Sequence, residues 1–241
     1  MRLHSKQETE PIAVTLDRYR AELLEHPLLV AARSGQIERP ILSRFAFYQY
    51  SDSITWIPML AQMKSRARRS GRLRRAIEEN IAHEAGIGGT SHVTYAARLM
   101  RSLGVRELAD YPTEGLARTA SLWLSDGFAE MTEPELAGWL LVAETLVPEM
   151  FAIVKPCFDA LAEADVEYFA EHIHVDTDEH ARWMAEAVDE IVQIYGASCI
   201  PQILDGMADA FAETLEDPDA LWKLRESAEN LREEGTPCAS H

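Results

Sequence analysis

Residues 169–191 read FAEHIHVDTDEHARWMAEAVDEI and carry the pattern on which the fold prediction depends. At 100° per residue, one face of this segment is an apolar stripe made of Phe169, Ile173, Met184, Ala187 and Ile191. His172, Asp176 and His180 project onto that stripe or its border, whereas His174 and Asp178 project to the far side. The segment therefore predicts a long amphipathic helix that turns two imidazoles and one carboxylate toward a protein core.

The core-facing set of His172, Asp176 and His180 favours a metal site. A carboxylate on a buried stripe is unfavourable unless it is paired or bound to a metal. Imidazoles together with a carboxylate suit zinc or a redox-active first-row metal, and helical bundles commonly hold iron with such mixed ligands. A solvated polar helix is the alternative, because His and Asp are mostly exposed in proteins.

The composition favours a globular protein without a nucleic-acid or membrane partner. The chain has 241 residues, of which 47% are hydrophobic, and a formal net charge of −17. Nucleic acids and anionic membranes both require a basic surface. The N-terminal residues lack the apolar segment of a secretory signal, and no apolar run approaches the length of a membrane span. Cys157, Cys199 and Cys238 are dispersed and typical of reduced thiols, so we expect a cytoplasmic location.

The apolar pattern has a helical period along nearly the whole chain and predicts an all-α fold. Short breaks at Pro or Gly predict antiparallel packing into one domain over residues 1–241, a bundle of about seven to eight helices. Roughly ten N-terminal and eight C-terminal residues are polar and expected to be flexible. Pro58 is expected to kink the second helix. With ends defined to about four residues, the expected helices cover residues 12–25, 39–69, 72–84 continuing to 103, 113–130, 134–162, 164–195, 198–215 and 218–233.

A second group of metal-binding side chains lies in the segment HEAGIGGTSH, residues 83–92. Glu84 continues the apolar stripe of the preceding helix, and His92 begins a new stripe, so both are expected to face the core. His83 projects elsewhere and is expected at the surface or rim. Each glycine of the segment disfavours helix by roughly 1 kcal/mol, which predicts a distorted or broken turn. A loop between two separate helices is the alternative.

Glu144 is the third feature, because it is the only charged residue between Glu135 and Glu149. A lone carboxylate in an apolar run is either functional or paired within the core. Pro148, one turn later, cannot bond to the Glu144 carbonyl. Three predicted helices thus supply six core-facing donors: Glu84, His92, Glu144, His172, Asp176 and His180. Three carboxylates and three imidazoles suffice for two metal ions, and a mononuclear site that uses a subset is the alternative.

The order of these motifs resembles the heme-oxygenase-like diiron oxidases, over residues 44–195. The shared pattern is Glu-Gly-spacer-His, then a lone Glu on a later helix, then His-x3-Asp followed by a further His. The resemblance implies a heme-oxygenase-like helical fold, a cofactor of two iron ions, and O2 as co-substrate. It also implies that the six donors are the iron ligands and catalytic residues. The spacing from Asp176 to His180 is one residue longer than the commonest family spacing. The alternative is that a π-bulge near residues 177–180, or a different helix register, recruits His174 or Asp178 instead.

The expected helix over 39–69 buries a face with Gln49 and Trp56, and Asp52 projects onto the same face. Asp52 is expected to hydrogen-bond a ligand imidazole, to pair with a substrate ammonium group, or to bind metal. Aromatic side chains expected to line a cavity are Tyr48, Trp56, Tyr95, Phe151 and Trp183. We expect a small-molecule substrate, with Asp52 favouring an amino acid or amine of specialised metabolism. Desaturation, hydroxylation, N-oxygenation and C–C cleavage all fit, and a homodimer is one expected assembly.

Other members of the same fold supply the competing expectations. A heme oxygenase needs a proximal imidazole, for which His26 is the proposal, although it lies at a proline-flanked break. A thiaminase-like enzyme needs a nucleophilic thiol, either Cys157 or Cys199. Cofactor-free quinone synthases bind a polyanionic substrate, which this acidic chain would repel. A non-enzymatic helical scaffold would bind no iron tightly.

Overall fold

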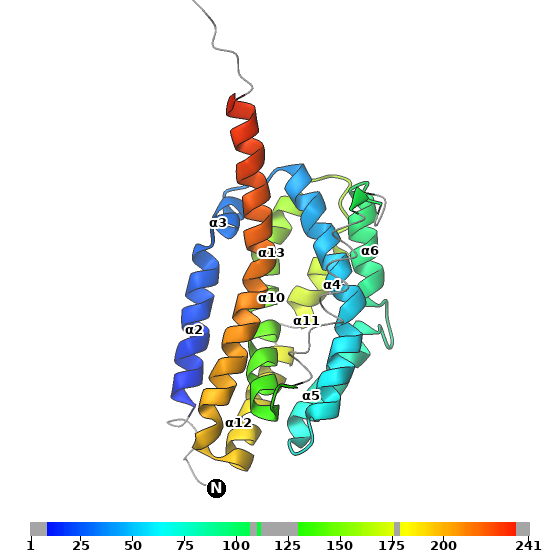
Figure 1. Cartoon of the computed structure of the whole chain (residues 1–241). Coiled ribbons are helices and arrows are strands. Elements are labelled where there is room, and N and C mark those ends of the chain that lie inside the picture. Colours follow the sequence, from blue (N-terminus) through cyan, green and yellow to red (C-terminus); the bar gives the residue numbers. More distant parts are fainter. Residues whose placement is uncertain (1–8, 107–109, 112–129, 176–178, 235–241) are drawn as a thin grey trace, which may run out of the picture.

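Figure 1 shows a computed structural model, which describes residues 9–106, 110–111, 130–175 and 179–234. Every regular element in these ranges is helical and none is a strand, so the all-α prediction is confirmed. The helices pack side by side as an elongated bundle, and α13 runs along its length (Figure 1). In chain order the elements are α2 (Glu10–Glu25), α3 (Pro27–Arg33), α4 (Arg39–Arg66), α5 (Gly71–Glu84), α6 (His92–Ser102), α10 (Glu133–Asp159), α11 (Glu167–Val175), α12 (Ala181–Tyr195), the 3-10 turn η2 (Ala197–Cys199) and α13 (Ile200–Glu234).

Helix α10 is the centre of the bundle and contacts α2, α3, α4, α11, α12 and α13. Its start is fixed by a capping box, in which Thr132 accepts from the Glu135 N–H and the Glu135 carboxylate accepts from the Thr132 N–H. This helix is long and apolar enough to cross a membrane, but 72% of its most apolar window is buried inside the protein. The protein core therefore accounts for its hydropathy.

Helices α10 and α13 approach each other so closely that their backbones touch. A Cβ atom added at Gly138 of α10 would lie 2.0 Å from the carbonyl oxygen of Ile203. A Cβ atom added at Gly206 of α13 would lie 2.0 Å from the carbonyl oxygen of Glu135. Only glycine fits at either position, since real side chains do not approach backbone oxygens this closely.

One of the expected helices is interrupted in the structure. The expected continuation of 72–84 to 103 is wrong, because α5 ends at Glu84 and α6 begins at His92. The described parts of the expected helix over 164–195 are α11, the π-helical residues 179–180 and α12. The expected helix over 113–130 lies almost entirely outside the described residues, as do Asp176 and Asp178.

The opposite correction applies to the last part of the chain. The expected helices over 198–215 and 218–233 form the single helix α13, which continues through Pro218. An internal proline disfavours a helix by about 3 kcal/mol. Leu221, on the next turn, is fully buried, so packing against the core extends the helix beyond the proline. Helix α4 likewise continues through Pro58. The short helix α3 has no counterpart among the expected helices.

The glycine contact between α10 and α13 predicts a large stability difference between two Gly→Ala variants. Gly138→Ala should lower the free energy of unfolding by about 3 kcal/mol or more, because its methyl group would overlap the Ile203 carbonyl. Gly71→Ala is the matched control, since a Cβ atom there meets nothing within 4 Å. Urea unfolding of both variants measures the difference. Equal free energies of unfolding would contradict the close approach.

Candidate metal centre

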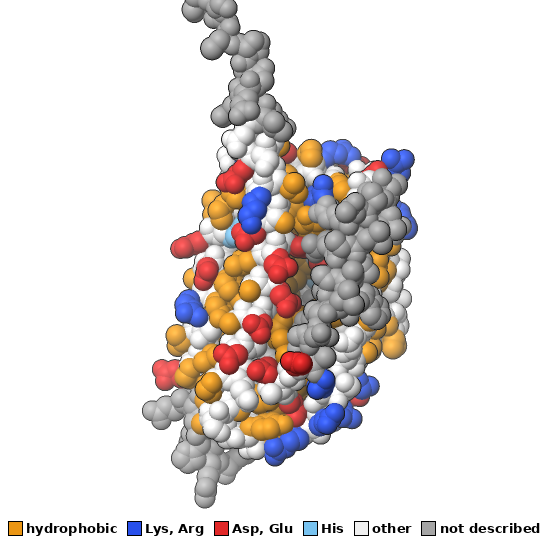
Figure 2. Space-filling view, viewed as in Figure 1, with side chains coloured by type: hydrophobic (Ala, Val, Ile, Leu, Met, Phe, Trp, Pro, Cys, Tyr) orange, Lys and Arg blue, Asp and Glu red, His pale blue; other side chains and the backbone are white. Residues whose placement is uncertain are grey.

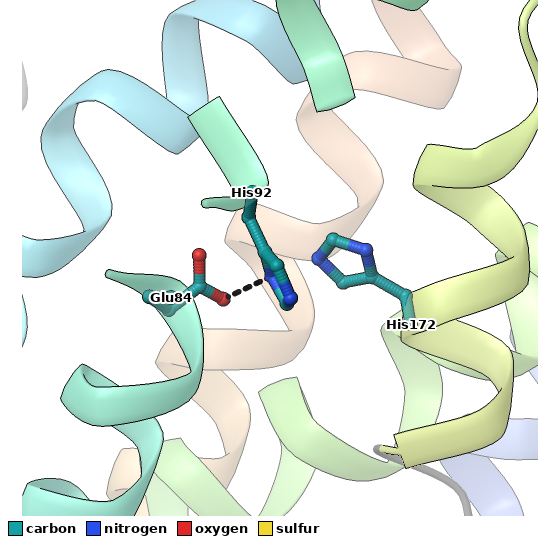
Figure 3. A group of neighbouring side chains, drawn as sticks. All are labelled: Glu84, His92 and His172. Carbon is teal, nitrogen blue, oxygen red and sulfur yellow. Dashed lines mark ion pairs between the residues drawn. The ribbon is translucent and has the colours of Figure 1, made fainter. Parts of the chain in front are cut away.

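Glu84, His92 and His172 form a buried cluster of potential metal ligands (Figure 3). Glu84 is the last residue of α5, His92 is the first of α6, and His172 comes from α11. One ligand atom of each residue lies within 4.8 Å of those of the other two. The structure thus brings together three of the six expected donors, from three helices.

A tight loop between α5 and α6 positions Glu84 and His92. Gly86 has a φ of +71°, and a Cβ atom there would lie 2.4 Å from the backbone nitrogen of Ser91. Ser91 in turn caps α6, because its hydroxyl accepts from the Thr94 N–H. The loop brings the two side chains so close that His92 Nδ1 lies 3.0 Å from Glu84 Oε1. Both side chains are buried.

His172 is held as a neutral imidazole with a defined tautomer. Its Nδ1 lies 2.8 Å from the backbone carbonyl of Tyr168, which can only accept, so Nδ1 carries the proton. The lone pair is therefore on Nε2. Burial, reinforced by the nearby His92, holds the pKa of His172 well below its usual value. A neutral imidazole whose other nitrogen donates to a carbonyl is the form that binds metals.

The donor atoms of the Glu84–His92–His172 cluster fit a metal ion. Two ligands at about 2.1 Å from one ion are separated by up to about 4.2 Å, so a small adjustment closes the cluster around it. In this structure His92 Nδ1 and Glu84 Oε1 pair with each other at 3.0 Å. Two imidazoles and one carboxylate with open positions are the ligand set of non-heme iron(II) oxygenases.

A second buried cluster contains Glu144 and His180, two further donors expected from the sequence. His180 Nδ1 lies 2.9 Å from Glu144 Oε2, and Asn80 donates a hydrogen bond to Glu144 Oε1. His180 Nε2 lies 2.8 Å from His83 Nδ1. All of these residues except the half-buried His83 are buried. Burial, together with His180, lowers the pKa of His83.

Sequence analysis missed the roles of Asn80 and His83 in this second cluster. His83, expected at the surface or rim, is half-buried and contacts His180. Asn80 lies four residues before Glu84, one helical turn away on the same face, and this spacing is the signal that could have found it. The expected ligand Asp176 and the alternative Asp178 lie outside the described residues, as does the side chain of His174. Residues 179–180 are π-helical, within the range considered for a π-bulge.

A cavity of about 350 Å³ is lined by residues of both clusters. Glu84 and His172 of the first and Glu144 of the second line it. Of the expected lining residues, Gln49, Asp52, Trp56 and Phe151 are present. Tyr48, Tyr95 and Trp183 are not among the described residues that line this cavity. Tyr48 is buried beside Phe47, the Tyr95 ring lies under Arg98, and Trp183 stacks on His180.

The cavity lining is acidic and aromatic. Its acidic side chains beyond the two clusters are Asp52, Glu213, Glu216 and Asp217. Acidic side chains also spread over the molecular face along which α13 runs (Figure 2). The Glu213 side chain is partly accessible to solvent. Desolvation by the surrounding protein nevertheless raises the pKa of its carboxyl to about 7. The neighbouring Glu216 and Asp209 raise this pKa further, and a hydrogen bond with Trp139 opposes the shift.

The residues that heme or thiol chemistry would require have structural roles instead. His26 caps α3, because its Nδ1 accepts from the Leu28 N–H, while its Nε2 lies 3.2 Å from Asp219 Oδ1. Both of its nitrogens are thus engaged. The Cys157 thiol donates to the Ala32 carbonyl, and burial raises the pKa of the Cys157 and Cys199 thiols. Neither thiol has the low pKa of a catalytic nucleophile.

Comparison with known proteins agrees with this geometry. Residues 41–212 match a family model described as an iron-containing redox enzyme. No curated protein matches the chain. A solved structure from Shewanella denitrificans OS217, described as a domain of unknown function with a heme oxygenase-like fold, superimposes with a TM-score of 0.67. It is 16% identical in sequence, and the alignment covers 100% of both chains. This likeness shows the fold alone.

The loop between Glu84 and His92 predicts that Gly86→Ala weakens metal binding. Gly86 and Gly35 both have positive φ, so alanine strains either position by about 1–2 kcal/mol. Only at Gly86 would the methyl group also overlap backbone, whereas at Gly35 nothing lies within 4 Å. Iron(II) should therefore raise the melting temperatures of the unmodified protein and of Gly35→Ala by the same amount, and it should raise that of Gly86→Ala by less. Equal shifts in the two variants would contradict the role of the loop.

Proposed function

Because the chain belongs to the family of iron-containing redox enzymes, we propose that it is a non-heme oxidase or oxygenase that uses dioxygen to oxidise a small organic substrate. The observation that carries this proposal is the buried Glu84–His92–His172 cluster, which opens into a cavity of about 350 Å³. Cavities of this size take small-molecule ligands. The acid and imidazole donors therefore stand where a substrate can reach them.

Two iron ions are the favoured cofactor. Glu84, His92 and His172 would hold one ion, and Glu144 and His180, with Asp176 as a further predicted ligand, would hold the second. Glu84 and Glu144 both line the cavity, which supports a shared centre. The alternative is a mononuclear iron enzyme, which the two-imidazole, one-carboxylate composition of the first cluster favours.

The protein's own part in the reaction is to hold the ligands and the substrate in position. Bound iron would supply the activation of dioxygen. The Tyr168 carbonyl fixes the His172 ring so that Nε2 remains available. Asn80 donates to one oxygen of Glu144 and so limits its rotation. The aromatic walls of the cavity, including Trp56, exclude water from the bound substrate.

The cavity lining supports an amine or amino acid as the substrate. Asp52, Glu213, Glu216 and Asp217 line it, and its described lining contains no Lys or Arg. A protonated amine would be attracted to these carboxylates and an anionic fatty acid repelled. The aromatic lining would cover the hydrocarbon part of the substrate, and ring faces also attract cations. Desaturation, hydroxylation, N-oxygenation and C–C cleavage all remain compatible outcomes.

Anaerobic titration with iron(II) tests the metal proposal. The unmodified protein should bind about two equivalents, as two-metal helical bundles do. His92→Ala should lose at least one of them, because it removes a ligand of the first cluster. His26→Asn is the matched control, since it removes a buried imidazole outside the site and asparagine can still cap α3. Saturation near one equivalent would favour the mononuclear enzyme, and no binding would refute the iron proposal.

Binding of uncharged and charged ligands tests the substrate class. Hexylamine should bind the iron-loaded protein more tightly than hexanol, and hexanoate should bind most weakly. Glu213 is largely protonated below its pKa of about 7 and ionised above it. Amine affinity should therefore rise between about pH 6 and pH 8, by up to about tenfold, as the ionised fraction of Glu213 increases. Glu213→Gln should remove most of this rise. Calorimetry that ranks hexanoate first would refute the amine proposal.

A further inference from the structure

Gln49 on α4 brings a buried amide group to the wall of the cavity. The residue is only 5% exposed, and it belongs to the cavity lining. The Tyr168 hydroxyl donates to Gln49 Oε1 at 3.5 Å, and the N–H groups of Gln49 Nε2 have no hydrogen-bond partner among the described residues. A buried N–H group without a partner is unfavourable, so an acceptor bound in the cavity would stabilise it.

The aliphatic hydroxyl groups of the cavity lining already use their protons within the protein. Ser53, Thr55 and Thr214 donate to backbone carbonyls of their own helices at 2.8, 2.9 and 2.8 Å. Each hydroxyl has a single proton, so none remains for a ligand. Among the described lining residues, the Gln49 amide is therefore a donor that a ligand can use, and the indole N–H of Trp56 is the competing donor.

Gln49 lies at the end of the cavity that adjoins the Glu84–His92–His172 cluster. The side chain of Gln49 contacts the hydroxyl of Tyr168, whose backbone carbonyl accepts from His172 Nδ1. The rings of Tyr168 and His172 also pack together, with centroids 4.3 Å apart. A substrate oxygen bound to Gln49 would therefore lie close to the residues proposed to hold iron.

The acidic residues of the lining lie further along the cavity. Asp52 follows Gln49 by three residues, so the two share a face of α4 and are about 4.5 Å apart along the helix axis. One turn beyond, the Trp56 ring packs against Trp139, which hydrogen-bonds to Glu213. The cavity thus has a hydrogen-bond donor near the cluster and carboxylates away from it. This polarity suits a molecule with an oxygen acceptor a few bonds from an ammonium group.

We propose that Gln49 determines substrate specificity by donating a hydrogen bond to a carbonyl-type oxygen, in a carboxamide or a carboxylate, that lies a few bonds from the substrate amine. This inference rests on the proposed function, and it narrows the substrate class from amines in general to amino acids and their amides. The carboxamide is the favoured acceptor, because the acidic lining has no described Lys or Arg and repels a carboxylate.

Calorimetry with three related ligands tests this role. Pentylamine, norleucinamide and norleucine share a five-carbon amine, and only the last two carry a carbonyl-type oxygen. The iron(II)-loaded protein, kept free of oxygen, should bind norleucinamide at least about threefold more tightly than pentylamine, which is the effect of one hydrogen bond. Gln49→Met keeps the length of the side chain but has no N–H, so it should lose this advantage and bind pentylamine with unchanged affinity. Gln62→Met, on an exposed position of the same helix, is the matched control and should keep the advantage.

Two further variants separate recognition by Gln49 from other causes. Gln49→Leu repeats the test with a second apolar side chain, and circular dichroism checks that each variant is folded. Trp56→Phe removes the competing indole N–H but keeps a ring, and it should retain the advantage of norleucinamide.

Each outcome of the ligand comparison decides the proposal. Loss of a norleucine advantage in Gln49→Met, in place of a norleucinamide advantage, would support it with a carboxylate as the acceptor. Equal affinities of the unmodified protein for all three ligands would overturn it. An advantage that persists in Gln49→Met, or an equal weakening of all three ligands, would overturn it as well. These results leave the proposed function intact, whereas a protein that binds neither iron(II) nor any amine refutes that function.

Discussion

The contact between Glu84 and His92 is the constraint on which the arrangement of the site depends. Both side chains are buried, and an ionised carboxylate in a protein interior must be paired or bound to metal. Because Glu84 Oε1 and His92 Nδ1 lie 3.0 Å apart, the end of α5 must lie beside the start of α6. Gly86 permits the tight loop that joins the two helices at this distance. Helix α4 packs along both helices, so its cavity-facing residues are positioned by the same constraint.

The glycine contact between α10 and α13 brings together the two helices that line the cavity across from α4. Glu144 lies six residues after Gly138 on α10, and Glu213 lies seven residues after Gly206 on α13. Both carboxylates line the cavity within two turns of the point where the backbones touch. Near this contact the Glu213 carboxyl reaches Trp139 of α10, and desolvation by the surrounding protein raises its pKa although the side chain remains partly accessible. The same helix pair therefore serves both the packing of the bundle and the proposed recognition of substrate.

Sequence periodicity predicts the helical fold and the direction of the donor side chains, because both follow from which helix face is apolar. Glu84, His92, His172 and His180 are buried, as their projections indicate, and so is Glu144, the lone charge in its apolar run. Periodicity cannot predict partners across helices, so the roles of His83 and Asn80 became visible only in the structure. A prediction from sequence also places a helix end at every glycine and proline alike, although a helix ends beside Gly86 and continues through Pro218. Tertiary packing decides between these outcomes.

Regular and irregular helix segments both supply donors to the two clusters. Glu144 and His172 lie inside the regular helices α10 and α11, as in other helical bundles that hold metals. Glu84 and His92 lie at a broken turn, and His180 lies in a π-helical one. His180, in the π-helical pair of residues 179–180, contacts both Glu144 and His83.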